Sequence, residues 1–150
     1  MVDVIKFLLG LGFVFFVVMV ISYILYAIGL MKMFHKMGQP AWKAFIPFLN
    51  DYTLIDRTWD AKYFWIMLLL AVAIRFLGGM SDSSMMSAVI AVGSLALGII
   101  EIYSNYMQSK AFGCGIGMAL ILTLFPAIGT MLLGYGSYEY RGPQEMVHIV

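Results

Sequence analysis

The chain has 150 residues, the length of one ordinary domain. Apolar residues make up 63% of it and charged residues 11%, with a net charge of +1, whereas soluble globular domains have about 45–50% and about 25%. A water-soluble chain this short cannot bury so much apolar surface. The composition excludes a soluble enzyme, a disordered regulator and a nucleic-acid-binding protein, and it predicts an integral membrane protein whose main partner is the lipid bilayer.

Residues that could carry chemistry are few. The single cysteine, Cys114, cannot form a disulfide within the chain, and no His-Glu-x-x-His pattern or other cluster of metal ligands occurs. We therefore expect no cofactor and no metal. No serine has a basic side chain at a matching depth in the predicted spans, so we expect no enzymatic activity.

The first predicted membrane span covers residues 4–31 and contains one charge, Lys6. As a helix it is about 42 Å long, which exceeds the hydrocarbon core of about 30 Å. A signal peptide is the alternative interpretation. The apolar run is too long for one, and no small-residue cleavage site follows it, so we predict an uncleaved membrane helix.

Residues 32–62 form a charged loop that contains a short apolar segment at residues 41–49. Its aromatic residues Trp42 and Phe45 are typical of a helix that lies in the lipid headgroup region, and Pro47 is expected to end or kink that helix. The segment is interpreted either as a structural corner or as a docking surface for a partner. The residues of this candidate docking loop are Trp42, Phe45, Pro47 and Asn50. Asn50 is expected either to cap the turn or to hydrogen-bond the backbone groups that the break frees.

Three further spans are predicted, at residues 63–80, 85–106 and 116–135. The second and third spans form an antiparallel hairpin, because the turn between them is short. The last span carries no charge but contains Pro126. The predicted fold is an all-α integral membrane protein with four transmembrane helices and a short interfacial helix, forming a single domain of residues 1–150 with a tail at 136–150.

The basic residues of the short loops predict the orientation, because they gather on the cytoplasmic side. Six lie in the first loop and in the loop before the last span, whereas only Lys6 and Arg141 lie on the other side. We therefore expect loop 32–62 to be cytoplasmic and both termini to be outside.

The third span carries a stripe of small and polar residues at alternating intervals of three and four positions. Such residues share one helix face. The stripe is interpreted either as a packing surface for another helix, since small side chains let backbones approach, or as the lining of a site or path. It consists of Ser87, Ala91, Ser94, Gly98, Glu101, Asn105 and Gln108.

Glu101 is the costly member of the stripe, because a carboxylate inside a membrane costs about 2.5–3.5 kcal/mol. Arg75 is the obvious partner, but it lies about 8 Å from the outer end of its span, whereas Glu101 lies about 24 Å from the outer end of its own. We therefore expect Arg75 to extend outward toward Asp82, and Glu101 to meet groups near the cytoplasmic side such as Asn105. The candidate intramembrane polar site comprises Glu101, Asn105, Ser94 and Arg75.

The last span carries a matching small face at Thr123, Ala127, Thr130 and Gly134. We expect this face to pack against the stripe of the third span, so that these two helices form a close pair.

Two motifs occur in the loops. Lys36, Gly38, Trp42, Ala44, Ile46, Pro47, Asn50 and Tyr52 fit K-x-G-x-x-x-W-x-A-x-I-P-x-x-N-x-Y, and Lys110, Phe112, Gly113, Gly115 and Gly117 fit K-x-F-G-x-G-x-G. Over residues 22–140 the chain resembles small bacterial four-helix membrane proteins of unassigned function that are often labelled signal-peptidase-I-like. The resemblance implies a bacterial membrane and a partner in envelope or export machinery. The protease's own motifs do not occur, so it implies no catalytic residues.

Two functions remain open. The first is a non-enzymatic accessory or interaction subunit of a larger envelope, export or transport complex, which binds other membrane proteins or itself through small-residue faces. The alternative is an oligomeric small transporter or channel that uses the Glu101 stripe. An intramembrane enzyme is the weakest hypothesis.

Overall fold

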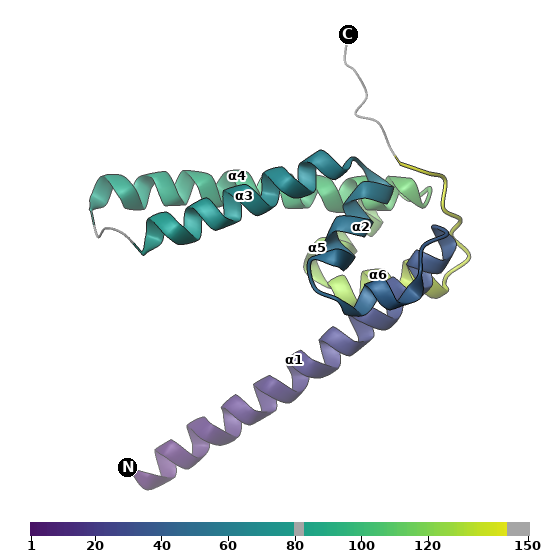
Figure 1. Ribbon diagram of the computed structural model, residues 1–150. Coiled ribbons are helices and arrows are strands. Elements are labelled where there is room, and N and C mark those ends of the chain that lie inside the picture. The colour runs from purple at the N-terminus through teal and green to yellow at the C-terminus, as the bar shows by residue number, and fades with distance from the viewer. Residues whose placement is uncertain (80–82, 144–150) are drawn as a thin grey trace.

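The computed structural model describes residues 1–79 and 83–143, and within these ranges all regular structure is helical (Figure 1). The all-α prediction is confirmed. In chain order the elements are α1 (Val2–Lys36), the 3-10 helix η1 (Ala41–Phe45), α2 (Leu49–Thr58), α3 (Ala61–Gly78), α4 (Ser84–Ala111), α5 (Ile116–Leu124) and α6 (Pro126–Tyr135).

Three of the described helices, α1, α3 and α4, are long and apolar enough to cross a bilayer. They correspond to the first three predicted spans. The helices α1 and α4 continue about five residues beyond their apolar runs, into residues 32–36 and 107–111. The apolar run therefore located each span, but it did not mark where the helix ends.

The helices α1 and α4 each end at a glycine, and the geometry of the two ends is the same. Gly38 has φ +67° and Gly113 has φ +71°, the left-handed conformation that glycine adopts without a steric penalty. After α1, the Gln39 amide donates to the Phe34 carbonyl at 2.8 Å. After α4, the Cys114 amide donates in the same way to the Ser109 carbonyl at 2.9 Å. These are Schellman caps, and they account for Gly38 and Gly113 in the two loop motifs.

The predicted single helix over residues 116–135 is wrong. The segment forms two short helices, α5 and α6, which meet at Phe125 (φ −138°, ψ 70°). Pro126 causes the break, because proline disfavours helical geometry in the preceding residue and cannot donate a backbone hydrogen bond. It occupies the first turn of α6, where that donor is not needed. With 9 and 10 residues, each helix is only about 15 Å long and cannot cross a bilayer alone.

The helices α5 and α6 pack on different partners. The α5 helix runs back along α4, where Thr123 meets Asn105. The α6 helix runs along α1, with its Thr130 against Gly29. The predicted close pair between the third and last spans is therefore correct only for the α5 half. The small face of the last span is divided by the break, and Thr130 and Gly134 contact α1 instead.

The chain enters and leaves the α5–α6 hairpin at the same end of the molecule, and residues 136–143 follow there. The Tyr140 hydroxyl donates to the Arg57 carbonyl of the first loop. The Arg141 amide donates to the Ala111 carbonyl at the end of α4, at 2.7 Å. The described residues of the tail therefore lie beside loop 32–62, because the chain turns back at Pro126.

The predicted interfacial segment 41–49 is also shorter than expected. The helix η1 ends at Phe45, and a turn through Pro47 and Phe48 leads into α2, which was not predicted. The α2 helix buries Leu54 and Ile55 against the other helices. It brings the middle of the charged loop back into the helical bundle.

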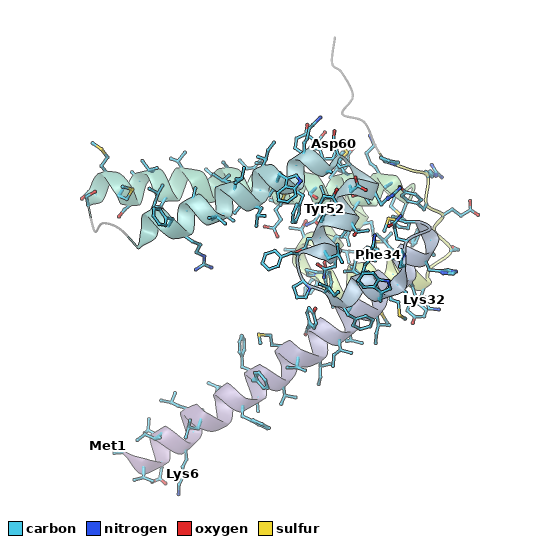
Figure 2. All side chains as sticks on the ribbon, in the orientation of Figure 1. Met1, Lys6, Lys32, Phe34, Tyr52 and Asp60 are labelled. Carbon is cyan, nitrogen blue, oxygen red and sulfur yellow. The ribbon has the colours of Figure 1, made fainter. Side chains whose placement is uncertain are left out.

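The two ends of the molecule differ in packing. We call the end that contains η1, α2, α5, α6 and the C-terminal third of α1 the packed end, and the opposite end the open end. The core lies at the packed end, around Leu30, Phe34 and Leu133. In the open end α1 diverges from the α3–α4 hairpin (Figure 1), and its residues 2–25 are exposed. Figure 2 shows Phe34 inside the packed end, whereas Met1 and Lys6 lie at the free end of α1.

Candidate functional site

A cavity of about 720 Å³ lies where the helices converge, and residues from all six α-helices line it. Apolar side chains from α2, α3 and α4 form much of the wall. The polar groups of the wall come from α1, α2, α4, α5 and α6; they are Tyr26, Asp51, Glu101, Ser104, Asn105, Gln108, Thr123 and Thr130. A mostly apolar wall with a few converging polar groups is typical of a small-molecule site.

Two carboxylates from different elements face this cavity. Glu101 comes from the middle of α4, and Asp51 comes from the first turn of α2. Burial raises the pKa of the Asp51 carboxyl above its usual value, and the negative charge of Glu101 raises it further. The fold thus brings together two like charges that lie 50 positions apart in the sequence.

A chain of hydrogen bonds connects α4 to α5 along one wall. The Gln108 amide donates to the Asn105 side-chain oxygen at 3.3 Å, and the Asn105 amide donates to the Thr123 hydroxyl at 3.2 Å. Thr123 in turn donates to the Ala119 carbonyl at 2.9 Å. These bonds fix the orientation of the amides, because each donor has one acceptor on a rigid helix.

The break between α5 and α6 borders the same cavity, since both Thr123 and Pro126 line it. Beyond the break, the Thr130 hydroxyl donates to the carbonyls of Ala127 (3.2 Å) and Tyr26 (3.4 Å). Irregular backbone at membrane depth is tolerated where it is buried in protein or lines a cavity. The position of the break satisfies that requirement.

The family of unknown function DUF5684 matches residues 42–143, which is more than half of the chain. The chain belongs to this family. The expectation of a family without an assigned function is confirmed. Neither a search of curated proteins nor a search of solved structures gave a match.

The part of the chain that matches DUF5684 begins in η1 and ends in the described tail. It includes the α2 helix, the α3–α4 hairpin and the α5–α6 hairpin, and therefore every cavity residue except Tyr26. The exposed part of α1 lies outside the match.

The structure divides the predicted polar site between two cavities. Glu101 and Asn105 line the central cavity. Arg75 and Ser94 line a second groove of about 750 Å³ between α3 and α4, which Glu101 also reaches. Arg75 and Glu101 form no ion pair among the described residues. Asp82, the expected partner of Arg75, lies outside the described residues.

Sequence reasoning missed Asp51 and Tyr26. Asp51 lies in the charged loop 32–62, and nothing local in the sequence shows that α2 returns to the bundle. The only signal is the helical spacing of Asn50, Leu54 and Thr58, one buried face of α2. Tyr26 lies within the continuous apolar run of the first span, where no pattern separates a cavity-lining position from a lipid-facing one.

The candidate docking loop is divided between a buried anchor and an exposed surface. Asn50 is 3% exposed; its side-chain oxygen accepts from the Asp51 amide at 2.6 Å, and its amide donates to the Ala44 carbonyl at 3.4 Å. Asn50 thus bonds backbone groups of its own turn and of η1, whereas the N-cap position of α2 is Phe48, which makes no side-chain cap bond. Trp42 and Phe45 are 57% and 50% exposed. The loop is therefore a structural corner that leaves two aromatic side chains free to contact lipid or protein.

Aromatic residues surround the packed end near the starts of α2 and α3. Trp59 stacks on Tyr63 with ring centroids 3.4 Å apart, and its edge meets Tyr103 at 5.2 Å. Tyr52 packs in a T-shape on Phe64 at 5.4 Å. Tyr and Trp are enriched at the boundary between membrane and water.

Proposed function

We propose that this DUF5684 protein is a non-enzymatic integral membrane protein that acts as a subunit of a larger assembly in a bacterial plasma membrane, such as an envelope, export or transport complex. The observation that carries the proposal is the unpartnered half of the α4 stripe. In the open end, Ser87, Ala91 and Ser94 are exposed, although two of them are polar and the helix is apolar enough to cross a bilayer.

The α4 helix packs on α3 through a neighbouring face. A Cβ atom added to Gly93 would lie 3.3 Å from Ile74 of α3, whereas one added to Gly98 on the stripe would meet nothing within 4 Å. Small residues let helix backbones approach, and serine hydroxyls form hydrogen bonds between helices within the bilayer. A helix of a partner protein, or of a second copy, is therefore the occupant that this face suits.

The charged residues of the groove support the same proposal. Arg75 and Glu101 both line the groove between α3 and α4 that the stripe borders. Charged side chains at membrane depth face a bundle interior or a water-filled space rather than lipid. A helix covering the groove would remove both side chains from lipid.

We propose a topology of three crossings and one hairpin that re-enters from the cytoplasmic side. The N-terminus is outside, and the first loop, the loop before α5 and residues 136–143 are cytoplasmic. In this topology Arg141 is cytoplasmic. The loops and termini then carry seven basic residues on the cytoplasmic side and only Lys6 on the outer side. The basic residues are thus distributed more asymmetrically than with both termini outside.

Cysteine labelling in intact cells tests this topology. In a Cys114→Ser background, single cysteines replace Lys6, Lys43 and Glu139. We expect a membrane-impermeant maleimide to label position 6 from outside, and positions 43 and 139 only after the cells are opened. Labelling of position 139 from outside together with position 6 would restore the topology with four spans.

Co-purification from native membranes followed by mass spectrometry tests the assembly. A matched pair of variants locates the interface. Ala91→Leu places a large side chain on the stripe, whereas Ala96→Leu makes the same change on the opposite side of α4. We expect Ala91→Leu to reduce recovery of the partner or second copy at least fivefold, and Ala96→Leu to leave it unchanged. A monodisperse monomer without partners, or equal recovery with both variants, contradicts the proposal.

The second candidate is an oligomeric small transporter or channel that uses Glu101. It is favoured by the position of the helix break beside a cavity with two carboxylates, because interrupted helices at membrane depth often form substrate and ion sites. Proton or cation flux into liposomes is the test. Glu101→Gln should abolish the flux of the parent, and the absence of flux in the parent would exclude this candidate.

A further inference from the structure

We propose that the central cavity binds a small organic cation, an amine or onium compound with apolar substituents, between the carboxylates of Asp51 and Glu101. The inference rests on the second candidate function and names the class of its ligand.

The charge of the cavity is the first argument. Two carboxylates line it, and none of its described lining residues is a lysine, arginine or histidine. Like charges that line the same site repel each other, and they are stabilised when a cation lies between them. The chain supplies no such cation from its own described residues.

A hydroxyl without a partner in the protein is an independent second observation. Ser104 is only 3% exposed and lines the cavity, yet its hydroxyl has no hydrogen-bond partner within residues 1–79 and 83–143. No fully enclosed side-chain oxygen in these ranges lacks a partner, so the small accessible area of Ser104 includes its hydroxyl oxygen. Buried hydroxyls are nearly always satisfied, by protein, water or a ligand. Ser104 therefore offers a polar contact to a molecule inside the cavity.

The volume of the cavity and its apolar, aromatic lining indicate which class of cation it suits. A volume of about 720 Å³ far exceeds the roughly 30 Å³ that one water molecule occupies. Tyr26, Phe48 and Phe64 supply aromatic faces, which attract organic cations. Among the described residues no group of three or more metal-ligating side chains occurs. The cavity is thus too large and too apolar for a bare metal ion, and it suits an organic cation.

Tetraphenylphosphonium is a suitable probe, and tetraphenylborate is its matched anion of nearly the same shape. Saturable binding to the purified full chain in lipid nanodiscs is measured by equilibrium dialysis. We expect the parent to bind the cation saturably and not to bind the anion. Glu101→Gln and Asp51→Asn should each weaken the affinity at least tenfold. Glu139→Gln, which removes an acid outside the cavity, should leave the affinity unchanged.

A second variant guards against misfolding of the charge variants. Gly98 lines the cavity and has open space at its Cβ position, so Gly98→Leu should fill part of the cavity and weaken binding without a clash. All variants are compared as monodisperse peaks in size-exclusion chromatography. Parent-like affinity in both Glu101→Gln and Asp51→Asn overturns the inference, as does equal saturable binding of the anion.

The binding measurement and the flux measurement distinguish failure of the cation site from failure of the transporter. Saturable, carboxylate-dependent binding without any flux would support the cation site and exclude the transporter. Flux that depends on Glu101, without binding of the organic cation, would support the transporter and overturn the cation site in favour of protons or inorganic ions.

Discussion

The packed end and the open end both contain long apolar segments of α1 but differ in their contacts. At the packed end, Leu30, Met33 and Phe34 of α1 are fully buried. Within the open end of the same helix, residues 2–25 are exposed and no part of the best membrane window is buried. Hydropathy therefore does not determine packing within this chain. In lipid, where apolar contact alone gives little advantage, close backbone approach and polar contacts determine where helices associate.

The packed end is built around one close crossing of α1 and α6. A Cβ atom added to Gly29 would lie 2.6 Å from the Thr130 backbone, and one added to Gly134 would lie 2.6 Å from the Gly29 carbonyl oxygen. Next to this crossing, the Lys36 ammonium group donates to the carbonyls of Leu133, Gly136 and Tyr138 at 2.7, 2.8 and 2.9 Å. The glycines allow the approach, and the lysine completes the end of α6.

The largest expected effect comes from filling this crossing. Gly29→Leu forces α6 away from α1 and should cost about 3 kcal/mol of stability, because atoms forced into a packed interface displace backbone. Gly12→Leu is the control on the same helix, since a Cβ atom there meets nothing within 4 Å. Thermal unfolding in nanodiscs measures both. Equal stability of the two variants would show that the packed and open ends do not differ as described.

Removing the lysine cap should have the next largest effect. Lys36→Met keeps the length of the side chain but loses three charge-assisted hydrogen bonds, so we expect a loss of about 2 kcal/mol. Residues 136–143 should then become more susceptible to proteolysis. Lys43→Met is the control, because Lys43 bonds only the Gln39 side chain nearby. Unchanged protection of the tail would mean that Tyr140 and Arg141 hold it without the lysine.

A pair of glycine variants separates backbone conformation from packing. Gly113→Ala places a Cβ atom at φ +71° beside the Arg141 guanidinium group and should destabilise the chain by about 1 kcal/mol. Gly117→Ala lies inside α5 with open space around it and should stabilise the chain by about 0.5–1 kcal/mol. If both variants change the melting temperature in the same direction, the cap at the end of α4 does not have the described role.

The smallest effect is a pH dependence that arises at Asp51. Its pKa is raised in the folded chain above the ordinary value of 3.8, so the folded state holds this proton more tightly than the unfolded state. The resulting stabilisation is present at low pH and is lost as the pH rises through the folded pKa. The melting temperature of Asp51→Asn should therefore depend less on pH, between pH 4 and neutrality, than that of the parent. An unchanged slope would show that folding does not raise the pKa of the Asp51 carboxyl.

Local chemistry in the sequence determined much of the fold. Apolar runs located the three long helices, because about twenty apolar residues are what a bilayer selects. Pro126 lies in the last predicted span, but the sequence does not show whether it kinks that helix or ends it. The depth difference between Arg75 and Glu101 followed from helix rise alone.

Only the tertiary structure decided where these elements meet. Pro126 can kink a spanning helix or reverse the chain, and the contacts of Gly29 and Lys36 with α6 select reversal here. That reversal brings the described tail beside the first loop, and the unpredicted α2 helix brings Asp51 beside Glu101. Both outcomes depend on contacts between residues far apart in sequence. Local propensity cannot encode them, because the same short segments would be equally regular with other partners.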